Sequence, residues 1–196
     1  MENNVISLSK GEKISLSKDV PGFTHLDIGL GWNPQKREGE KFDLDAYALI
    51  LDADSNLLDG AASFIYFDNR DSKCGAINLS EDNKDGEGDG DDEIIKIDFT
   101  KLPQAVSKIL IAVGIHEASE RGQNFGRVDE PEINLYESGD ETPKYNYELG
   151  EENALATCVV YAEIYRHKDE WKYAIKDEAV DGGIGSMLTS YGMQVS

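Results

Sequence analysis

The feature of this 196-residue chain that most restricts its fold is an acidic, glycine-rich stretch at residues 81–93. It reads EDNKDGEGDGDDE and holds eight carboxylates against one lysine, with glycines at 86, 88 and 90. Such closely spaced negative charges repel one another unless a cation lies among them, which keeps the stretch out of an apolar core. An apolar run at residues 94–99 follows directly, so we expect a loop anchored to a strand, with a solvated acidic loop as the alternative.

The rest of the chain has the pattern of an all-β protein. Residues 23–32 alternate apolar and polar side chains, the two-residue period of a half-buried strand, and residues 42–51 form a longer buried run. Further strands are expected at 63–67, 94–99, 108–115, 132–136, 145–149, 157–165 and 171–175. Many short strands separated by turns predict a single domain, residues 1–196, folded as a β-sandwich of two packed, mainly antiparallel sheets with one or two short helices, one of them at 184–191.

A small repeat opens the chain, with ISLSK at residues 6–10 and ISLSK again at 14–18. Each copy alternates apolar with polar residues, and the GEK segment between them has the composition of a tight turn. We therefore expect the two copies to pair with each other as a β-hairpin.

Composition excludes several classes of function. With 19 basic and 39 acidic residues, the formal charge of −20 disfavours nucleic-acid binding, because there is no basic stripe to neutralise phosphates. No stretch approaches the roughly 20 apolar residues of a transmembrane segment, and the first residues lack the features of a signal peptide. The two cysteines, Cys74 and Cys158, form no CxxC pair. We expect a cytoplasmic protein with free thiols.

The acidic stretch is joined by a second pair of acids. Asp43 and Asp45 open the strand expected at 42–51, and side chains two apart on a strand share a side, while Leu44 faces the core. Hard divalent cations bind carboxylate, amide and backbone oxygens, and calcium tolerates irregular geometry. The acidic stretch is not an EF-hand, because Lys96 stands where the closing glutamate is needed. We therefore interpret it as a calcium-binding loop.

A set of short motifs occurs in the same order as in the tellurium-resistance TerD family: GLGW at 29–32, FDLDA at 42–46, DN at 82–83, GEGDGDDE at 86–93, IH at 115–116, QNFG at 123–126 and AEIYR at 162–166. The chain resembles that family over nearly its whole length. Two positions depart from it, Glu81 where the family usually has glycine and Glu117 where it usually has aspartate. Neither change removes a carboxylate, so the expected metal binding stands.

The resemblance implies a bacterial cytoplasmic β-sandwich that binds one or two Ca²⁺ ions in acidic loops at one end. It implies a non-enzymatic module of a tellurite and chemical-stress resistance system, which presents its calcium-loaded end to other proteins of that system. Whether those partners associate with the membrane is left open. The ligand pool implied by the matching positions is Asp43, Asp45, Asp82, Asn83, Glu87, Asp89, Asp91, Asp92 and Glu93.

Two other functions use the same carboxylates. A metal-dependent enzyme, for instance a hydrolase of phosphate compounds, needs an open coordination site near a base such as His116. We do not expect His116 to pair with Glu117, because adjacent residues of a strand point to opposite faces. Calcium-dependent membrane docking needs a basic patch or an apolar loop tip, and we expect neither here, so sedimentation with vesicles is predicted to be negative.

Overall fold

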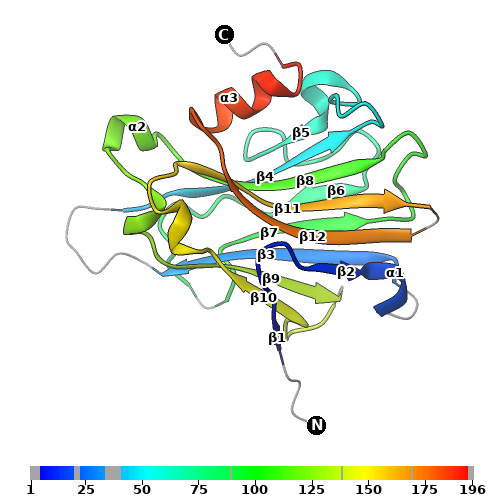
Figure 1. Ribbon diagram of the computed structural model, residues 1–196, viewed down its shortest axis with the longest axis horizontal. Helices are drawn as coiled ribbons and strands as arrows, with labels where there is room; N and C mark the ends of the chain where they lie inside the picture. Colours follow the sequence, from blue (N-terminus) through cyan, green and yellow to red (C-terminus); the bar gives the residue numbers. More distant parts are fainter. Residues whose placement is uncertain are drawn as a thin grey trace.

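The protein is a β-sandwich of two six-stranded sheets, as the sequence predicts. The computed structural model describes residues 5–19, 23–33, 41–88, 90–137, 139–168 and 170–193. Figure 1 shows the strands of both sheets running across the molecule in roughly the same direction. Such an aligned arrangement lets the inward side chains of both sheets interdigitate.

The first sheet has the order β1 (Ile6–Ser7), β10 (Tyr145–Glu148), β9 (Asp129–Glu137), β3 (His25–Asn33), β7 (Glu93–Asp98) and β6 (Ile77–Leu79). The second has the order β2 (Lys13–Ser15), β12 (Glu170–Ala179), β11 (Cys158–His167), β8 (Lys108–Ile115), β4 (Leu44–Leu51) and β5 (Phe64–Ile65). Neighbouring strands are antiparallel except β1 and β10, which are parallel. The three-residue strand β6 was not predicted from the sequence.

Helices are few and short. The predicted C-terminal helix is confirmed as α3 (Gly183–Ser190), whereas α1 (Leu16–Asp19) and α2 (Ala118–Arg121) were not predicted. The 3₁₀ turns are η1 (Gly60–Ser63), η2 (Phe125–Arg127) and η3 (Glu151–Asn153). Within the described ranges, no helix is long and apolar enough to cross a membrane.

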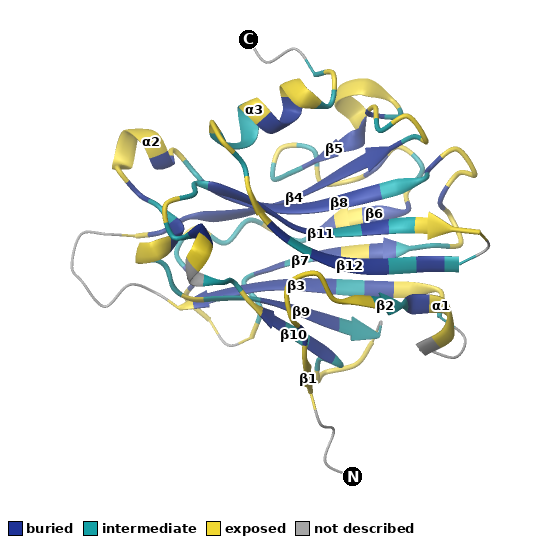
Figure 2. Ribbon diagram, in the orientation of Figure 1, coloured by how far each residue is buried: buried dark blue, intermediate teal, exposed yellow. Residues whose placement is uncertain are grey.

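The main core lies between the sheets. The alternating apolar residues of β3, from Leu26 to Trp32, point into it, which confirms the two-residue period of that segment. A second apolar cluster covers the outer face of the second sheet, where Tyr47 and Leu49 of β4 pack with Met187 and Leu188 of α3. Strand β4 is therefore buried on both faces, as Figure 2 shows, and this explains its nearly continuous apolar sequence.

The N-terminal repeat does not form the predicted hairpin. Strand β1 pairs with β10 in the first sheet, while β2 pairs with β12 in the second. Both copies instead place the same leucine in the main core, Leu8 in the first and Leu16 in the second. The repeat thus encodes a common pattern of burial, and the chain between the copies passes from one sheet to the other with Gly11 at a φ of 80°.

Candidate metal centre

Three carboxylates from two distant parts of the chain meet at one end of the sandwich. Asp43 stands just before β4 and Asp45 lies within it, while Asp82 comes from the segment between β6 and β7. Each offers a side-chain oxygen, and these oxygens all lie within 4.8 Å of one another. Leu44 is buried in the main core, so the predicted shared side of Asp43 and Asp45 is confirmed.

A fourth carboxylate reaches this cluster from the opposite sheet. Glu93 is the first residue of β7 and is only 1% exposed. Its Oε2 accepts a hydrogen bond from the backbone N–H of Ala46 at 2.7 Å. Strand β5 pairs only with Ala48 and Leu49 of β4, so Glu93 provides the hydrogen-bond acceptor for an N–H of β4 beyond the end of β5.

Several oxygens of the four acids lack a partner although they are buried. Among the described residues, Asp43 Oδ1, Asp82 Oδ1 and Glu93 Oε1 have no hydrogen-bond donor. The other oxygen of Asp82, Oδ2, lies 3.3 Å from the ammonium group of Lys84. Since an unpaired buried carboxylate oxygen is unfavourable, these three atoms are the positions at which the cluster could hold a cation.

The electrostatics of the cluster agree with this geometry. Burial raises the pKa of Asp43, raises the pKa of Asp45 to about 6, and raises the pKa of Glu93 to about 8. Nearby carboxylates add to each shift, with Asp45 and Asp82 acting on Glu93. A divalent cation would favour the ionised forms and reverse these shifts.

Asp45 also has two neighbours on its own side of the sheet. Its Oδ2 accepts a hydrogen bond from the hydroxyl of Tyr47 at 2.9 Å and lies 3.5 Å from Nδ1 of His116. The Nε2 atom of His116 lies 3.7 Å from Oε1 of Glu117, so the expectation that these two side chains diverge is wrong. Strand β8 ends at Ile115, and Glu117 turns back with a φ of 51°. The strand alternation therefore stops before this pair.

Two further members of the predicted ligand pool shape the acidic loop. Asn83 Oδ1 accepts hydrogen bonds from the backbone N–H groups of Asp85 and Gly86 at 3.2 and 3.1 Å, while its Nδ2 donates to Asp92 Oδ1 at 2.8 Å. Asp92 Oδ2 accepts from the backbone N–H of Trp32 at 3.0 Å. The structure thus gives both side chains hydrogen-bonded roles in the loop, and their metal ligation stays a prediction.

The other predicted ligands lie elsewhere or are not described. Glu87 is exposed, and Asp89 lies outside the described residues. Asp91 folds over the outer face of the first sheet, where its Oδ1 accepts a hydrogen bond from Asn134 at 2.8 Å. A Cβ atom on Gly29 would lie 1.9 Å from Oδ2 of Asp91, so a side chain at this position would require the Asp91 carboxylate to shift. Of the nine predicted ligands, the structure therefore brings together Asp43, Asp45 and Asp82, with Glu93 close enough to interact electrostatically with Asp45 and Asp82.

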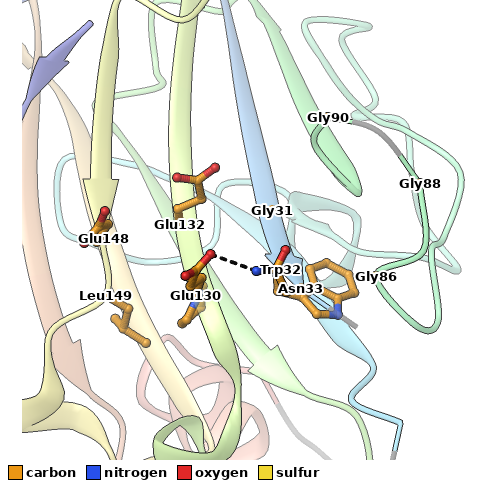
Figure 3. A pocket seen from close by; sticks show the side chains of 11 residues that line it. Gly31, Trp32, Asn33, Gly86, Gly88, Gly90, Glu130, Glu132, Glu148 and Leu149 are labelled. Atoms are coloured by element: carbon orange, nitrogen blue, oxygen red, sulfur yellow. Dashed lines mark hydrogen bonds between the residues drawn. The ribbon is translucent and has the colours of Figure 1, made fainter. Parts of the chain in front are cut away.

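A groove beside the glycine-rich loop is lined by acids outside the predicted ligand pool (Figure 3). It has a volume of about 410 Å³ and is lined by Glu130 and Glu132 of β9 and Glu148 of β10, opposite the loop glycines. Asn33 donates a hydrogen bond to Glu130 Oε2 at 2.8 Å. Glu132 and Glu148 could have been found from the sequence, because alternate residues of a strand face solvent and both acids occupy outward positions of β9 and β10.

Two features of the neighbouring segments complete this end of the molecule. Gln123, in the QNFG motif, is buried and donates from Nε2 to the carbonyl of Lys41 at 2.9 Å, which fixes the segment after α2 beside the start of β4. Leu155 is 87% exposed, and its neighbours Ala154 and Ala156 accept backbone hydrogen bonds from η2. Leu155 is thus an exposed apolar side chain in a segment where no apolar loop tip was expected, and the predicted absence of vesicle binding stays a prediction.

The fold and the site define a class of protein, an all-β sandwich whose acidic loop and strand ends gather buried carboxylates suited to a hard cation. The TerD domain model matches residues 5–191, and the chain belongs to the TerD-domain family. The resemblance seen in the motifs is confirmed.

The chain is similar in sequence to two named bacterial proteins and in fold to a solved structure. It is 39% identical to tellurium resistance protein TerD of Serratia marcescens over 191 residues, which cover 97% of this chain and 99% of that protein. It is 35% identical to general stress protein 16U of Bacillus subtilis strain 168 over 191 residues, 97% of this chain and 98% of the other. The crystal structure of a TerD homologue from Streptomyces coelicolor A3(2) shares the fold, with a TM-score of 0.69, 22% identity, and coverage of 88% of this chain and 100% of that one.

Proposed function

We propose that this protein binds one or two Ca²⁺ ions at the acidic end of the sandwich and acts as a non-enzymatic, calcium-responsive module. The observation that carries the proposal is the set of buried, unpartnered oxygens Asp43 Oδ1, Asp82 Oδ1 and Glu93 Oε1, with Asp45 beside them. All are hard oxygen donors, which suit calcium and magnesium better than metals that prefer sulfur or imidazole.

The origin of the ligands favours calcium over magnesium. Mg²⁺ requires a near-ideal octahedron of ligands, whereas Ca²⁺ accepts six to eight oxygens in an irregular arrangement. The three aspartate oxygens lie within 4.8 Å of one another, and they come from a strand end and from the segment that leads into the glycine-rich loop. This arrangement adapts to an irregular coordination sphere.

Calcium binding would act on both charge and order. The four acids together carry four negative charges when ionised, so one Ca²⁺ ion leaves an excess of two, which supports a capacity of one or two ions. Binding neutralises the cluster, draws the loop containing Asp82 onto β4 and stabilises the native state by mass action. The ordered end would then be recognised by another protein.

The names of the relatives suggest the biological setting. The Serratia marcescens protein is named for tellurium resistance and the Bacillus subtilis protein for general stress. We infer that this chain serves in a bacterial tellurite and chemical-stress resistance system, in the cytoplasm, and that its partners are other proteins of that system.

The direct test is a titration of metal-stripped protein with Ca²⁺ in excess Mg²⁺, followed by calorimetry and thermal unfolding. At a free concentration 100 times the Kd, calcium adds about 2.7 kcal/mol of stability, a rise in Tm of about 5–10 °C for a chain of this size. Asp43→Asn and Asp45→Asn are expected to lose this rise. Asp27→Asn, at the far end of β3, is the matched control. An unchanged rise in both site variants would contradict the site.

One observation favours a second candidate function. His116 is partly exposed and lies 3.5 Å from Asp45, so a base stands next to the cluster as a metal-dependent hydrolase of phosphate compounds requires. A substrate screen with Ca²⁺, Mg²⁺ and Mn²⁺ tests this candidate. Turnover that His116→Ala abolishes would favour the enzyme, and the absence of any metal-dependent turnover would leave the binding module.

A further inference from the structure

Tyr47 is in direct contact with the candidate metal centre, although it is not one of the predicted metal ligands. It follows Asp45 by two residues on β4, so both side chains lie on the same face of the second sheet. The Tyr47 hydroxyl donates to Asp45 Oδ2 at 2.9 Å, and His116 Nδ1 lies 3.5 Å from the same oxygen. Asp45 and Tyr47 are both buried, so water does not readily replace this hydrogen bond.

The position of the Tyr47 hydroxyl is determined by the packing of its ring. Gly114 of β8 pairs with Asp45 across the sheet, and a Cβ atom on Gly114 would lie 2.9 Å from Cε2 of Tyr47. The ring therefore lies against a glycine, and a side chain at this position would force the ring to shift. The ring also packs in the apolar cluster under α3, where the ring centroids of Tyr47 and Phe64 lie 5.5 Å apart.

We propose that Tyr47 is a positioning residue for the cation site. Its hydroxyl and His116 hold Oδ2 of Asp45, so that Oδ1 is presented to the ion beside Asp43 and Asp82 as a single-oxygen ligand. This inference rests on the proposed function. Because Asp45 is already held before the ion arrives, binding does not have to immobilise it, which raises the affinity and restricts the size of the ion.

Tyr47→Phe tests the proposal, because it keeps the ring and removes only the hydroxyl. Loss of a hydrogen bond to a charged acceptor is expected to raise the Kd for Ca²⁺ about tenfold in calorimetric titration. Tyr191→Phe is the matched control, since its ring packs against the same apolar cluster while the charges near it are those of Glu163, Glu178 and Lys176. Its Kd is expected to equal that of the unchanged protein.

A second readout separates positioning from a general structural effect. Without the Tyr47 hydroxyl, Asp45 is free to rotate and to offer both oxygens, which suits a larger ion. The ratio of Ca²⁺ affinity to Sr²⁺ affinity is therefore expected to fall several-fold in Tyr47→Phe, whereas a merely structural loss weakens both ions equally. Gly114→Ala keeps every polar group, and it is expected to weaken Ca²⁺ binding by displacing the ring.

The possible failures are distinguishable. If the unchanged protein does not bind Ca²⁺, the proposed function is overturned and the inference with it. If it binds Ca²⁺ and Tyr47→Phe binds equally well, or loses Ca²⁺ and Sr²⁺ affinity in the same proportion, only the role assigned to Tyr47 is overturned.

Discussion

Calcium binding should expel about one proton from this protein at pH 7, and the structure indicates its source. Burial raises the pKa of Glu93 to about 8 and the pKa of Asp45 to about 6. At pH 7 a carboxyl with the first pKa is roughly nine-tenths protonated and one with the second roughly one-tenth. A cation ligand must be ionised, so the two groups together release about one proton per binding event, most of it from Glu93.

The assay is calorimetric titration with Ca²⁺ in buffers that differ in their enthalpy of ionisation. The slope of the observed enthalpy against the buffer enthalpy gives the number of protons released. We expect about 1 at pH 7 and about 0.1 at pH 9, where Glu93 is already ionised, with binding about tenfold tighter at the higher pH. Glu93→Gln should reduce the release at pH 7 to about 0.1, while Glu178→Gln, on the exposed part of β12, should not change it.

The same shifts set the sign of the pH dependence of stability without metal. A carboxyl whose folded pKa lies above its unfolded value of 4.5 contributes most stability below pH 4.5, and this contribution is lost as the pH rises through 8. With a chelator present, the free energy of unfolding contributed by Glu93 should thus fall between pH 5 and pH 8, and saturating Ca²⁺ should remove the fall. Tight calcium binding at pH 7 without proton release would refute the reasoning, as would a release that Glu93→Gln leaves unchanged.

Three further predictions concern the rest of the fold. Gly29→Ala places a methyl group 1.9 Å from Asp91 Oδ2 and should cost about 1–3 kcal/mol in urea denaturation, whereas an unchanged midpoint would show that Asp91 moves freely. Asp177 is fully buried and accepts two side-chain hydrogen bonds, so Asp177→Ala should cost about 2–4 kcal/mol in the same assay, and a loss below about 1 kcal/mol would contradict that role. Cys158 is buried and its pKa is raised to about 12, so a thiol reagent at pH 8 should modify it only after unfolding, in contrast to the half-buried Cys74.

Individual strands and helices could be predicted from the sequence where a local apolar pattern determines them. Strand β8 matches the predicted range 108–115, and the range predicted for the C-terminal helix differs from α3 by one residue at each end, because each segment has a clear apolar pattern of its own. The N-terminal repeat shows the limit. Its alternation predicts two strands, but which sheet each strand joins depends on β10 and β12, more than 130 residues away along the chain.

For the candidate site, the sequence identifies possible carboxylate ligands, but it does not show which of them become buried in the folded protein. Asp43 and Asp45 are predictable as a pair because strand geometry relates them directly. The burial of Glu93 depends on three tertiary facts: β5 ends early, the edge of β4 is left open, and β7 begins opposite that edge. One carboxylate oxygen of Glu93 consequently accepts a hydrogen bond from the backbone N–H of Ala46, and the other oxygen has no hydrogen-bond donor. This hydrogen bond joins the two sheets at this end and holds Glu93 in place, so a cation that binds here must displace the proton that the raised pKa of Glu93 keeps on its carboxyl group.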